Sequence, residues 1–419
     1  MDYLNYNLYG LQYYYSNDLE TPYLNNTFFR RYDNNLPEQT IKPVAIREVV
    51  QPYQPEEKET PISDYLAKLA IVIPAHNEEK VIGKTLKTLM QVIDPSNIYV
   101  VSVASTDRTE KIVRSSGVNF LKNEKNLGKT RSLKKLIKEY SILENYDFMF
   151  ILDADTIPHH EFFERTIKHF KNPKVACACG HVVSEEKLNL FVAHRSVMYF
   201  IWQNIYKRIS VPFDGVTIAP GTASLYRTSV IKNIDFNEGL IIEDFDMTFQ
   251  VHRKRLGKII YEPSAKIITQ DPDNFKDYFK QVTRWQLGFV QTVVAHRVPF
   301  GLQPFDIVIV LLSLLDMIHS IFLLTIIPLI TWFYLLGGSE AAFGHAFMGS
   351  ALLRMLIGEV ALMWGFSLLQ MALTRNFSAA IYGPFLWSVQ YVNIAANFKA
   401  YYMAIFKSVN GAWKSPTRR

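Results

Sequence analysis

Three absences narrow the class of protein before any motif is considered. The chain of 419 residues has only two cysteines, Cys177 and Cys179, which lie too close along a strand to bridge. We therefore expect both to be reduced, buried and inert. No block of Lys and Arg follows the pattern of a nucleic-acid-binding protein, and the formal net charge is only +6, so no nucleic-acid partner is expected. No charged segment followed by an apolar run opens the chain, so no signal peptide is expected.

The segment 1–64 is rich in Tyr, Asn and Pro and has no sustained apolar periodicity. Such a sequence cannot build a core, so we expect a partly ordered extension. The whole chain is nevertheless 49% hydrophobic, which is ample for a core elsewhere. A mean hydropathy just above zero in a chain with 20% charged residues indicates a combination of soluble and membrane parts.

Short apolar strands alternate with helical stretches in residues 65–261. The expected strands are LAIVIPA at 69–75, NIYVVSV at 97–103 and FMFIL at 148–152, with helices from Val81, from Thr109 and from near Pro158. Strands separated by helices of this length predict an α/β domain with a mainly parallel central sheet. In such sheets ligands bind at the carboxyl ends of the strands, where this sequence places polar residues.

The C-terminal part is predicted to meet a lipid bilayer. Residues 262–304 mix aromatic and basic residues, as an amphipathic interface region does. Apolar runs follow at 305–336, 343–373 and 377–406, and the first two are long enough to span a bilayer. If the third run also crossed, the basic tail 407–419 would lie outside the cell, against the positive-inside rule. We therefore expect the third run to be interfacial, re-entrant or a hairpin at Gly383-Pro384.

Ionisable residues inside these runs are Asp316, Arg354 and Glu359. Such residues more often line a polar path or pair with one another than face lipid. Both interpretations stay open for Arg354 and Glu359.

Two carboxylates follow the third expected strand, at Asp153 and Asp155. Hard oxygen ligands with this spacing suit Mg²⁺ or Mn²⁺ bound together with a diphosphate. The alternative is a turn in which Asp caps the next helix.

Polar residues also follow the first two strands. Pro74, Asn77 and Glu78 end the first strand, and Asp107 follows the second; both turns suit donor binding, although helix caps use the same residue types. Lys129, after a glycine turn, could face a diphosphate or be solvated.

A third acidic group opens a later helix, with Glu243 and Asp244 after an apolar pair. A carboxylate crowded by another carboxylate and by apolar neighbours has a raised pKa, as a general base requires. Acidic residues in a first helical turn are also favoured by the helix dipole alone.

Gln281, Arg284 and Trp285 then recur at helical spacing. Arg284 suits a departing phosphate, and Trp285 suits stacking on a sugar ring. The alternative is an aromatic residue at the membrane interface beside an Arg whose charged end reaches the aqueous side.

Taken in order, the motifs IPAHNEE, STDRT, NLGK, DAD, IIEDFD and QVTRW resemble those of the inverting family 2 glycosyltransferases with a GT-A fold. The resemblance is greatest to the membrane-bound synthases of poly-N-acetylglucosamine, hyaluronan, chitin oligosaccharides and cellulose. It implies that Asp153 contacts the nucleotide ribose and the metal, that Asp155 is the metal ligand and that Asp244 is the catalytic base. It also implies that Gln281, Arg284 and Trp285 line the acceptor and diphosphate site, as do Gly221, Thr222 and Glu243 on the acceptor side. Residues 413–418 are similar to the Trp-containing gating tail of these synthases.

The resemblance implies transfer of a sugar from a nucleoside diphosphate sugar, UDP-linked in most of the family, to a growing β-linked polysaccharide. The alternatives are transfer of one sugar to a polyprenyl phosphate or other lipid acceptor, and an inactive membrane scaffold. The implied location is the plasma (inner) membrane, multi-pass, with a cytoplasmic catalytic domain.

Two departures from the family pattern matter. Ser102 and Val103 stand where the family usually has Asp to hold uracil, which leaves the donor base open. The N-terminal spans of the polymer synthases are also missing, so a homo-oligomer or a partner subunit would be needed to complete a channel.

Overall fold

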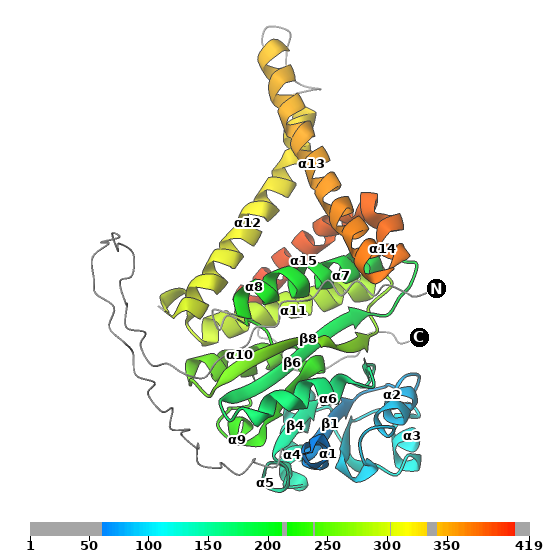
Figure 1. Cartoon of the computed structure of the whole chain (residues 1–419). Helices are drawn as coiled ribbons and strands as arrows, with labels where there is room; N and C mark the ends of the chain where they lie inside the picture. The colour runs from blue at the N-terminus through cyan, green and yellow to red at the C-terminus, as the bar shows by residue number, and fades with distance from the viewer. Residues whose placement is uncertain (1–60, 212–215, 238, 302, 333–341, 407–419) are drawn as a thin grey trace, which may run out of the picture. The chain divides into compact units, whose positions relative to one another are not determined.

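The computed structural model describes residues 61–211, 216–237, 239–301, 303–332 and 342–406, and Figure 1 shows its helices and strands. These residues all belong to one compact unit, 59–419. The predicted extension 1–64 falls almost entirely outside the described residues. The tail 407–419, including Trp413, falls outside them as well.

The described residues form a sheet of eight strands in the order β3-β2-β1-β4-β7-β6-β8-β5. The strands are β1 (Leu69–Ala75), β2 (Ile98–Val103), β3 (Asn119–Asn123), β4 (Phe148–Ile151), β5 (Ile157–Pro158), β6 (Val175–Ser184), β7 (Ser224–Arg227) and β8 (Lys258–Thr269). Strands β3, β2, β1 and β4 pair in parallel, as do β6 and β8, whereas β7 runs antiparallel to β4 and β6. The expected mainly parallel sheet is confirmed, with β7 and β5 as antiparallel additions.

Strand β1 is buried on both faces, which explains its uninterrupted apolar sequence. Ile71 and Ile73 pack in one core layer, while Ala70 and Val72 pack in the other. The first layer contains side chains of α2 (Ile82–Leu89) and α6 (Phe162–Ile167), and the second contains those of α4 (Lys129–Glu139) and α10 (Glu243–Arg253). Helices therefore cover both faces of the sheet, and the polar residues at the strand ends remain available for a site.

The remaining helices around the sheet are α1 (Ile62–Ala67), α3 (Thr109–Ser115), α5 (Ile142–Asn145), α7 (Leu190–Ile201), α8 (Arg208–Ser210), α9 (Thr228–Ile231) and α11 (Phe275–Ala295). A π-helical segment, Trp202–Lys207, continues α7. The expected helix starts at Val81 and Thr109 agree with the structure to within one residue. The buried cysteines are free, as expected, and lie on β6.

Two sequence-based boundaries need correction. The helix expected near Pro158 begins at Phe162, because Ile157 and Pro158 pair with β8 as the short strand β5. The sheet also continues past the expected boundary at residue 261, because β8 runs to Thr269. The amphipathic interface region is consequently α11, which begins at Phe275.

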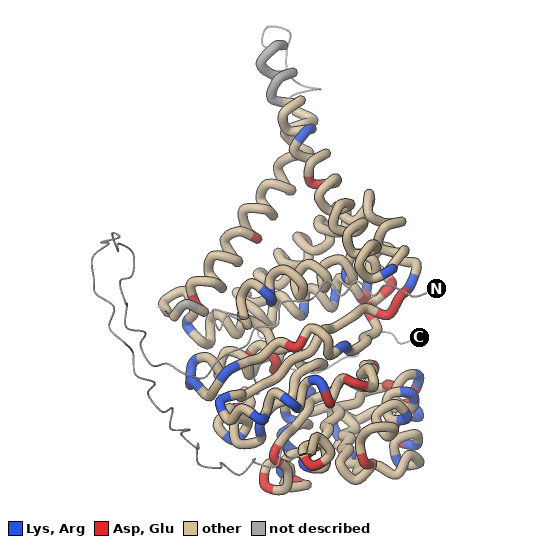
Figure 2. The backbone as a smooth tube through the Cα atoms, in the orientation of Figure 1, with Lys and Arg blue, Asp and Glu red and all other residues tan. Residues whose placement is uncertain are grey.

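Helices α12 (Pro304–Thr331) and α13 (Ala342–Thr374) are long and apolar enough to cross a membrane, by length and composition. Figure 2 shows few charged residues along either helix. The start of α12 is tied to the sheet domain, because Arg253 of α10 donates a hydrogen bond of 2.7 Å to Asp306. Asp306 also accepts a hydrogen bond from the backbone N–H of Gln303.

The third apolar run is not one helix. It forms α14 (Phe377–Tyr382), a turn at Gly383–Phe385 and α15 (Leu386–Phe406). Helix α15 packs along α11, and the side chain of Gln286 on α11 donates to the Tyr401 hydroxyl at 3.0 Å. Within the described ranges, only α12 and α13 meet the length and composition of a span. The break at Gly383 lies where the sequence predicted a hairpin.

Candidate active site

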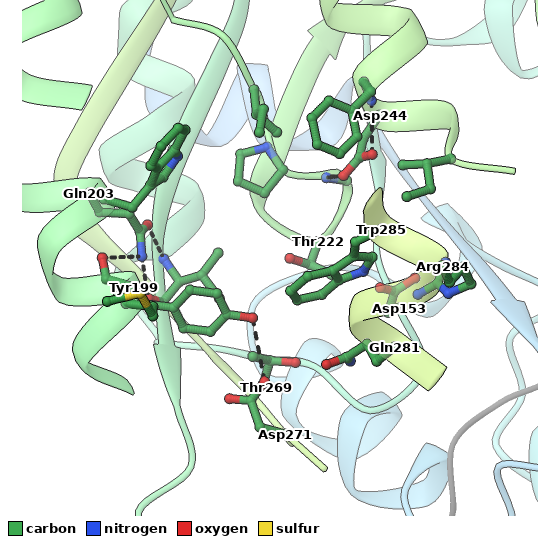
Figure 3. Close-up of a pocket in the computed structure, with 18 of the residues that line it drawn as sticks. Asp153, Tyr199, Gln203, Thr222, Asp244, Thr269, Asp271, Gln281, Arg284 and Trp285 are labelled. Atoms are coloured by element: carbon green, nitrogen blue, oxygen red, sulfur yellow. Dashed lines mark hydrogen bonds between the residues drawn. The ribbon is translucent and has the colours of Figure 1, made fainter. Parts of the chain in front are cut away.

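The polar strand ends open into a cavity of about 430 Å³. Figure 3 shows side chains from the sheet, α7, α10 and α11 turned toward it. Ten of the predicted site residues line this cavity: Lys129, Asp153, Asp155, Gly221, Thr222, Glu243, Asp244, Gln281, Arg284 and Trp285. The fold therefore brings residues from separate sequence motifs together in one cavity.

The first group in the cavity is acidic and is bridged by a lysine. Asp153 and Asp155 follow β4 and are half-buried. The ammonium group of Lys129, at the start of α4, lies 2.6 Å from Asp153 Oδ1 and 2.6 Å from Glu243 Oε1. Burial acts to lower the pKa of Lys129, but the attraction of the two carboxylates outweighs it and raises that pKa. Gly128 before it has a φ of +82°, a conformation that favours glycine.

The second group is centred on Asp244 in the first turn of α10. Its Oδ2 accepts the Gly221 N–H at 2.9 Å, and its Oδ1 accepts the Phe245 N–H at 2.8 Å. Gly221 permits this approach, since a Cβ there would lie only 3.3 Å from the Asp244 Cβ. Burial, followed by the charge of Glu243, raises the pKa of Asp244 to about 6, against the opposing effects of the Gly221 N–H and Lys129. Asp244 is therefore ionised at neutral pH and close to the range of an effective general base.

The third group lies on α11, where Gln281, Arg284 and Trp285 share one face because they are three and four residues apart. The Gln281 side-chain oxygen accepts a hydrogen bond from Arg195 at 3.0 Å. The structure records no hydrogen bond or ion pair between Arg284 and any other described residue, so its charge is available to a ligand in the cavity.

Helix α11 rests directly on the chain that leads into Asp244. A Cβ at Gly288 would clash with the side chain of Ile242, so only glycine permits this close approach. Ile242 immediately precedes Glu243 and Asp244. The position of α11 and that of the acidic pair are thereby linked.

Four predicted donor-binding residues lie outside the cavity lining, at the ends of β1 and β2: Pro74, Asn77, Glu78 and Asp107. The Asn77 side-chain oxygen accepts the Thr106 N–H at 2.8 Å. Asp107 accepts the Glu79 N–H at 3.0 Å and the Thr109 hydroxyl at 2.5 Å. These bonds tie the two turns together, so their donor-binding role stays a prediction.

Sequence reasoning missed part of the cavity wall. Tyr199 on α7, Gln203 and Lys207 on the π-helical segment, and Asp271 after β8 all line it. The apolar sequence of α7 gave no signal of a site, whereas Asp271 follows a strand end as Asp153 does and could have been found on that basis. Lys207 is 2% exposed, and burial lowers its pKa.

A second cavity, of about 410 Å³, lies between α7, α11, α12 and α15 and shares Trp285 with the first. Polar residues of the apolar helices line it, including Asp316, His319, Asn393 and Asn397. His319 lies 3.2 Å from Glu359 of α13. Among the described residues, Glu359 therefore pairs with His319, while Arg354 donates to Ser350. This pattern excludes the mutual pairing of Arg354 and Glu359 considered from the sequence.

A mostly parallel sheet with carboxylates at the tip of a buried strand, a further carboxylate across the same cavity and helices after the sheet define the GT-A fold. Residues 67–288, more than half of the chain, match the family described as glycosyltransferase like family 2. The chain therefore belongs to this family.

Curated relatives include poly-beta-1,6-N-acetyl-D-glucosamine synthases. The Staphylococcus aureus (strain COL) protein is 24% identical over 264 residues, covering 59% of this chain and 63% of the relative. The Staphylococcus epidermidis protein is 24% identical over 227 residues, covering 52% of this chain and 54% of the relative. The chain thus spans less than two thirds of the length of these relatives.

Solved structures with similarity include a mannosyltransferase from Pyrobaculum calidifontis in complex with GDP-Man and Mn²⁺. It is 14% identical with a TM-score of 0.48, and the match covers 79% of this chain and 87% of the other. Glucosyl-3-phosphoglycerate synthase from Mycobacterium tuberculosis, in complex with Mg²⁺ and uridine diphosphate, is 14% identical with a TM-score of 0.41, and the match covers 56% and 83%.

Proposed function

We propose that this protein is a membrane-bound inverting glycosyltransferase that moves a sugar from a nucleoside diphosphate sugar to a growing β-linked polysaccharide. The observation that carries the proposal is the single cavity that holds the strand-end acids, Asp244 and the α11 motif together. The family membership supports the reaction class. The Staphylococcus relatives are poly-beta-1,6-N-acetyl-D-glucosamine synthases, which supports a polysaccharide product.

In the proposed reaction an acceptor hydroxyl attacks C1 of the donor sugar from the face opposite the diphosphate. Asp244 takes the hydroxyl proton as the new C1–O bond forms. The bond from C1 to the diphosphate oxygen breaks, and the diphosphate leaves with the electron pair. Arg284 lies on the cavity wall and would stabilise the leaving charge. A base in this position contributes roughly 10²- to 10⁴-fold to the rate.

The residues after β4 fit a divalent cation. Asp153 and Asp155 both line the cavity and offer it hard carboxylate oxygens. Asp155 would be the principal metal ligand and Asp153 would also contact the ribose. When bound, Mg²⁺ or Mn²⁺ would offset the charge that develops on the diphosphate.

The donor base is left to experiment. Ser102 has no carboxylate to offer a uracil, and its hydroxyl donates a hydrogen bond of 3.0 Å to Glu110. Pro74, Asn77, Glu78 and Asp107 remain the proposed donor-binding residues at these strand ends. A UDP-linked donor is our first proposal, with a GDP-linked donor as the alternative.

The second cavity favours a chain as the acceptor. A processive enzyme must hold the product after each transfer and needs a polar path that leads away from the base. Trp285 lines both cavities, and Asn393, Asn397 and Asp316 provide polar groups in the second. A single sugar on a lipid phosphate would not require this path. Gly221, Thr222, Glu243 and Gln281 are the proposed acceptor-side residues of the first cavity.

We further propose a multi-pass protein of the plasma (inner) membrane. Helices α12 and α13 have the length and composition of spans, whereas α15 does not meet these criteria among the described helices and packs along α11. Nucleotide sugars are cytosolic, so the sheet domain would face the cytoplasm. A homo-oligomer or a partner subunit would complete a channel if two spans cannot enclose the product.

The test uses the purified full chain in lipid with a panel of labelled UDP- and GDP-sugars and Mg²⁺ or Mn²⁺. We expect transfer from one donor class, loss of transfer on metal chelation, and long products. A single sugar on polyprenyl phosphate would favour the lipid-acceptor alternative. Nucleotide binding without any transfer would favour an inactive scaffold.

A further inference from the structure

Arg195 lies behind the acceptor side of the proposed active site, on α7 and 90 positions before Trp285 in the sequence. Its side chain is only 8% exposed. The guanidinium carbon lies 4.3 Å from the centroid of the Trp285 ring. The same guanidinium donates a hydrogen bond of 3.0 Å to the Gln281 side-chain oxygen. One arginine therefore contacts two of the three motif residues on α11.

The burial of this charge is offset by other groups. Arg195 Nε lies 3.8 Å from Asp271 Oδ1, and the Tyr278 ring lies 4.9 Å from the guanidinium carbon. A buried ion pair stays in place only when its geometry and additional bonds offset desolvation. Tyr278 is itself fixed, because its hydroxyl donates to Asn393 of α15 at 3.0 Å. The guanidinium is thus held between α7, α11 and the segment after β8.

We propose that Arg195 is the positioning residue for the Trp285 ring, an inference that rests on the proposed function. The planar guanidinium covers one face of the indole and, through Gln281, holds the preceding turn of α11. The opposite face is then left for an acceptor sugar, and the ring is ordered before the sugar arrives. Ordering a ring in advance removes an entropy cost that the acceptor would otherwise meet on binding.

A purely structural role is the competing explanation, since the pair with Asp271 would stabilise the fold without any effect on the acceptor. The two roles differ in what they change. A structural role lowers stability and the fraction of active enzyme, so the apparent kcat falls while neither KM changes. A positioning role raises the acceptor KM and leaves the donor KM unchanged, and it acts only when Trp285 is present.

The experiment compares Arg195→Lys with wild type, using the donor identified by the panel and a β-1,6-linked N-acetylglucosamine tetrasaccharide as the acceptor probe. Lysine keeps the positive charge beside Asp271. It has no planar guanidinium to stack on the Trp285 ring, and its single ammonium group cannot donate to Gln281 with the same geometry. We expect the acceptor KM to rise roughly 5- to 30-fold, which corresponds to about 1 to 2 kcal/mol. The donor KM should change by less than about twofold.

Two controls isolate the effect. Arg114 lies 4.3 Å from the Phe120 ring centroid, the same separation, but is exposed and far along the chain from α7. Arg114→Lys should leave both KM values unchanged. In a Trp285→Ala background, Arg195→Lys should add no further rise in acceptor KM, because the ring that it positions is gone.

The outcomes separate the two proposals. An unchanged acceptor KM in an active Arg195→Lys protein, or an equal rise in the Trp285→Ala background, would overturn the positioning role alone. A wild-type protein that transfers no sugar from any donor to any acceptor would overturn the proposed function, and the positioning role with it. If Arg195→Lys does not fold, the double variant Arg195→Gln with Asp271→Asn leaves no unpaired buried charge and has the same expected result.

Discussion

The charge of Glu243 should raise the pH below which transfer is lost, because it raises the pKa of the neighbouring Asp244. Burial and then Glu243 raise the pKa of Asp244 from its ordinary 3.8 to about 6. Glu243→Gln removes the second of these causes and keeps the first. We therefore expect the pKa of Asp244 to fall by about one unit, since burial is the larger cause and remains.

The sign of the effect on activity follows from the role of a base. Asp244 accepts a proton only when it is ionised, so activity is full above its pKa and is lost as the pH falls through it. The acid limb of kcat/KM should lie near pH 6 in wild type and about one unit lower in Glu243→Gln. The maximum rate should also fall, because Glu243 holds the Lys129 ammonium at 2.6 Å.

The assay is kcat/KM for the acceptor as a function of pH, since this ratio reports the pKa of the free enzyme. Glu110→Gln is a matched control. Glu110 stands in the first turn of α3 and pairs with a lysine, Lys122, at 3.6 Å, but it does not line the cavity that holds Asp244. An acid limb that stays in place in Glu243→Gln, or that moves equally in Glu110→Gln, would refute this account of the base.

Four further predictions test the remaining roles in the site and the membrane association. Asp155→Asn should weaken both Mn²⁺ binding and donor binding, measured by calorimetry, along with turnover. Asp244→Asn should leave donor affinity nearly intact and lower transfer roughly 10²- to 10⁴-fold; transfer near the wild-type rate would show that another group is the base. Trp285→Ala should shorten the products, sized at low enzyme and excess donor, more than it slows the first transfer, and equal losses would contradict a role in guiding the chain. The full chain should stay in the membrane pellet after a carbonate wash, unlike a peripheral protein, because α12 and α13 have the length and composition of spans and would bury apolar side chains in lipid.

The sequence was most informative where local pattern and tertiary position agree. Strand β1 is apolar throughout because both of its faces are buried, and this pattern predicted the sheet and the edge at which the cavity lies. Asp153, Asp155 and Asp244 were predictable because each acid follows an apolar segment at an element boundary. Such boundaries are visible in a single sequence.

Contacts between distant elements could not be predicted in this way. The antiparallel strand β7 is only four residues long, and its place between β4 and β6 depends on pairing rather than on its own pattern. Arg195 stands in an apolar helix and gives no periodic signal, so its contact with Trp285 appears only in three dimensions. The pairing of His319 with Glu359 joins two long helices for which the sequence offers no register.

The close packing of Gly288 against Ile242 fixes the distance between α11 and the start of α10. Gly288 lies less than one helical turn after Trp285, and Ile242 lies two residues before Asp244. The spacing between the ring on which a chain end would rest and the carboxylate that would deprotonate it is therefore set by the packing of α11 against the residue that precedes α10. For an enzyme that adds many identical units, each new end would meet the base at the same separation as the one before. A methyl group at position 288 would change that separation for every cycle at once.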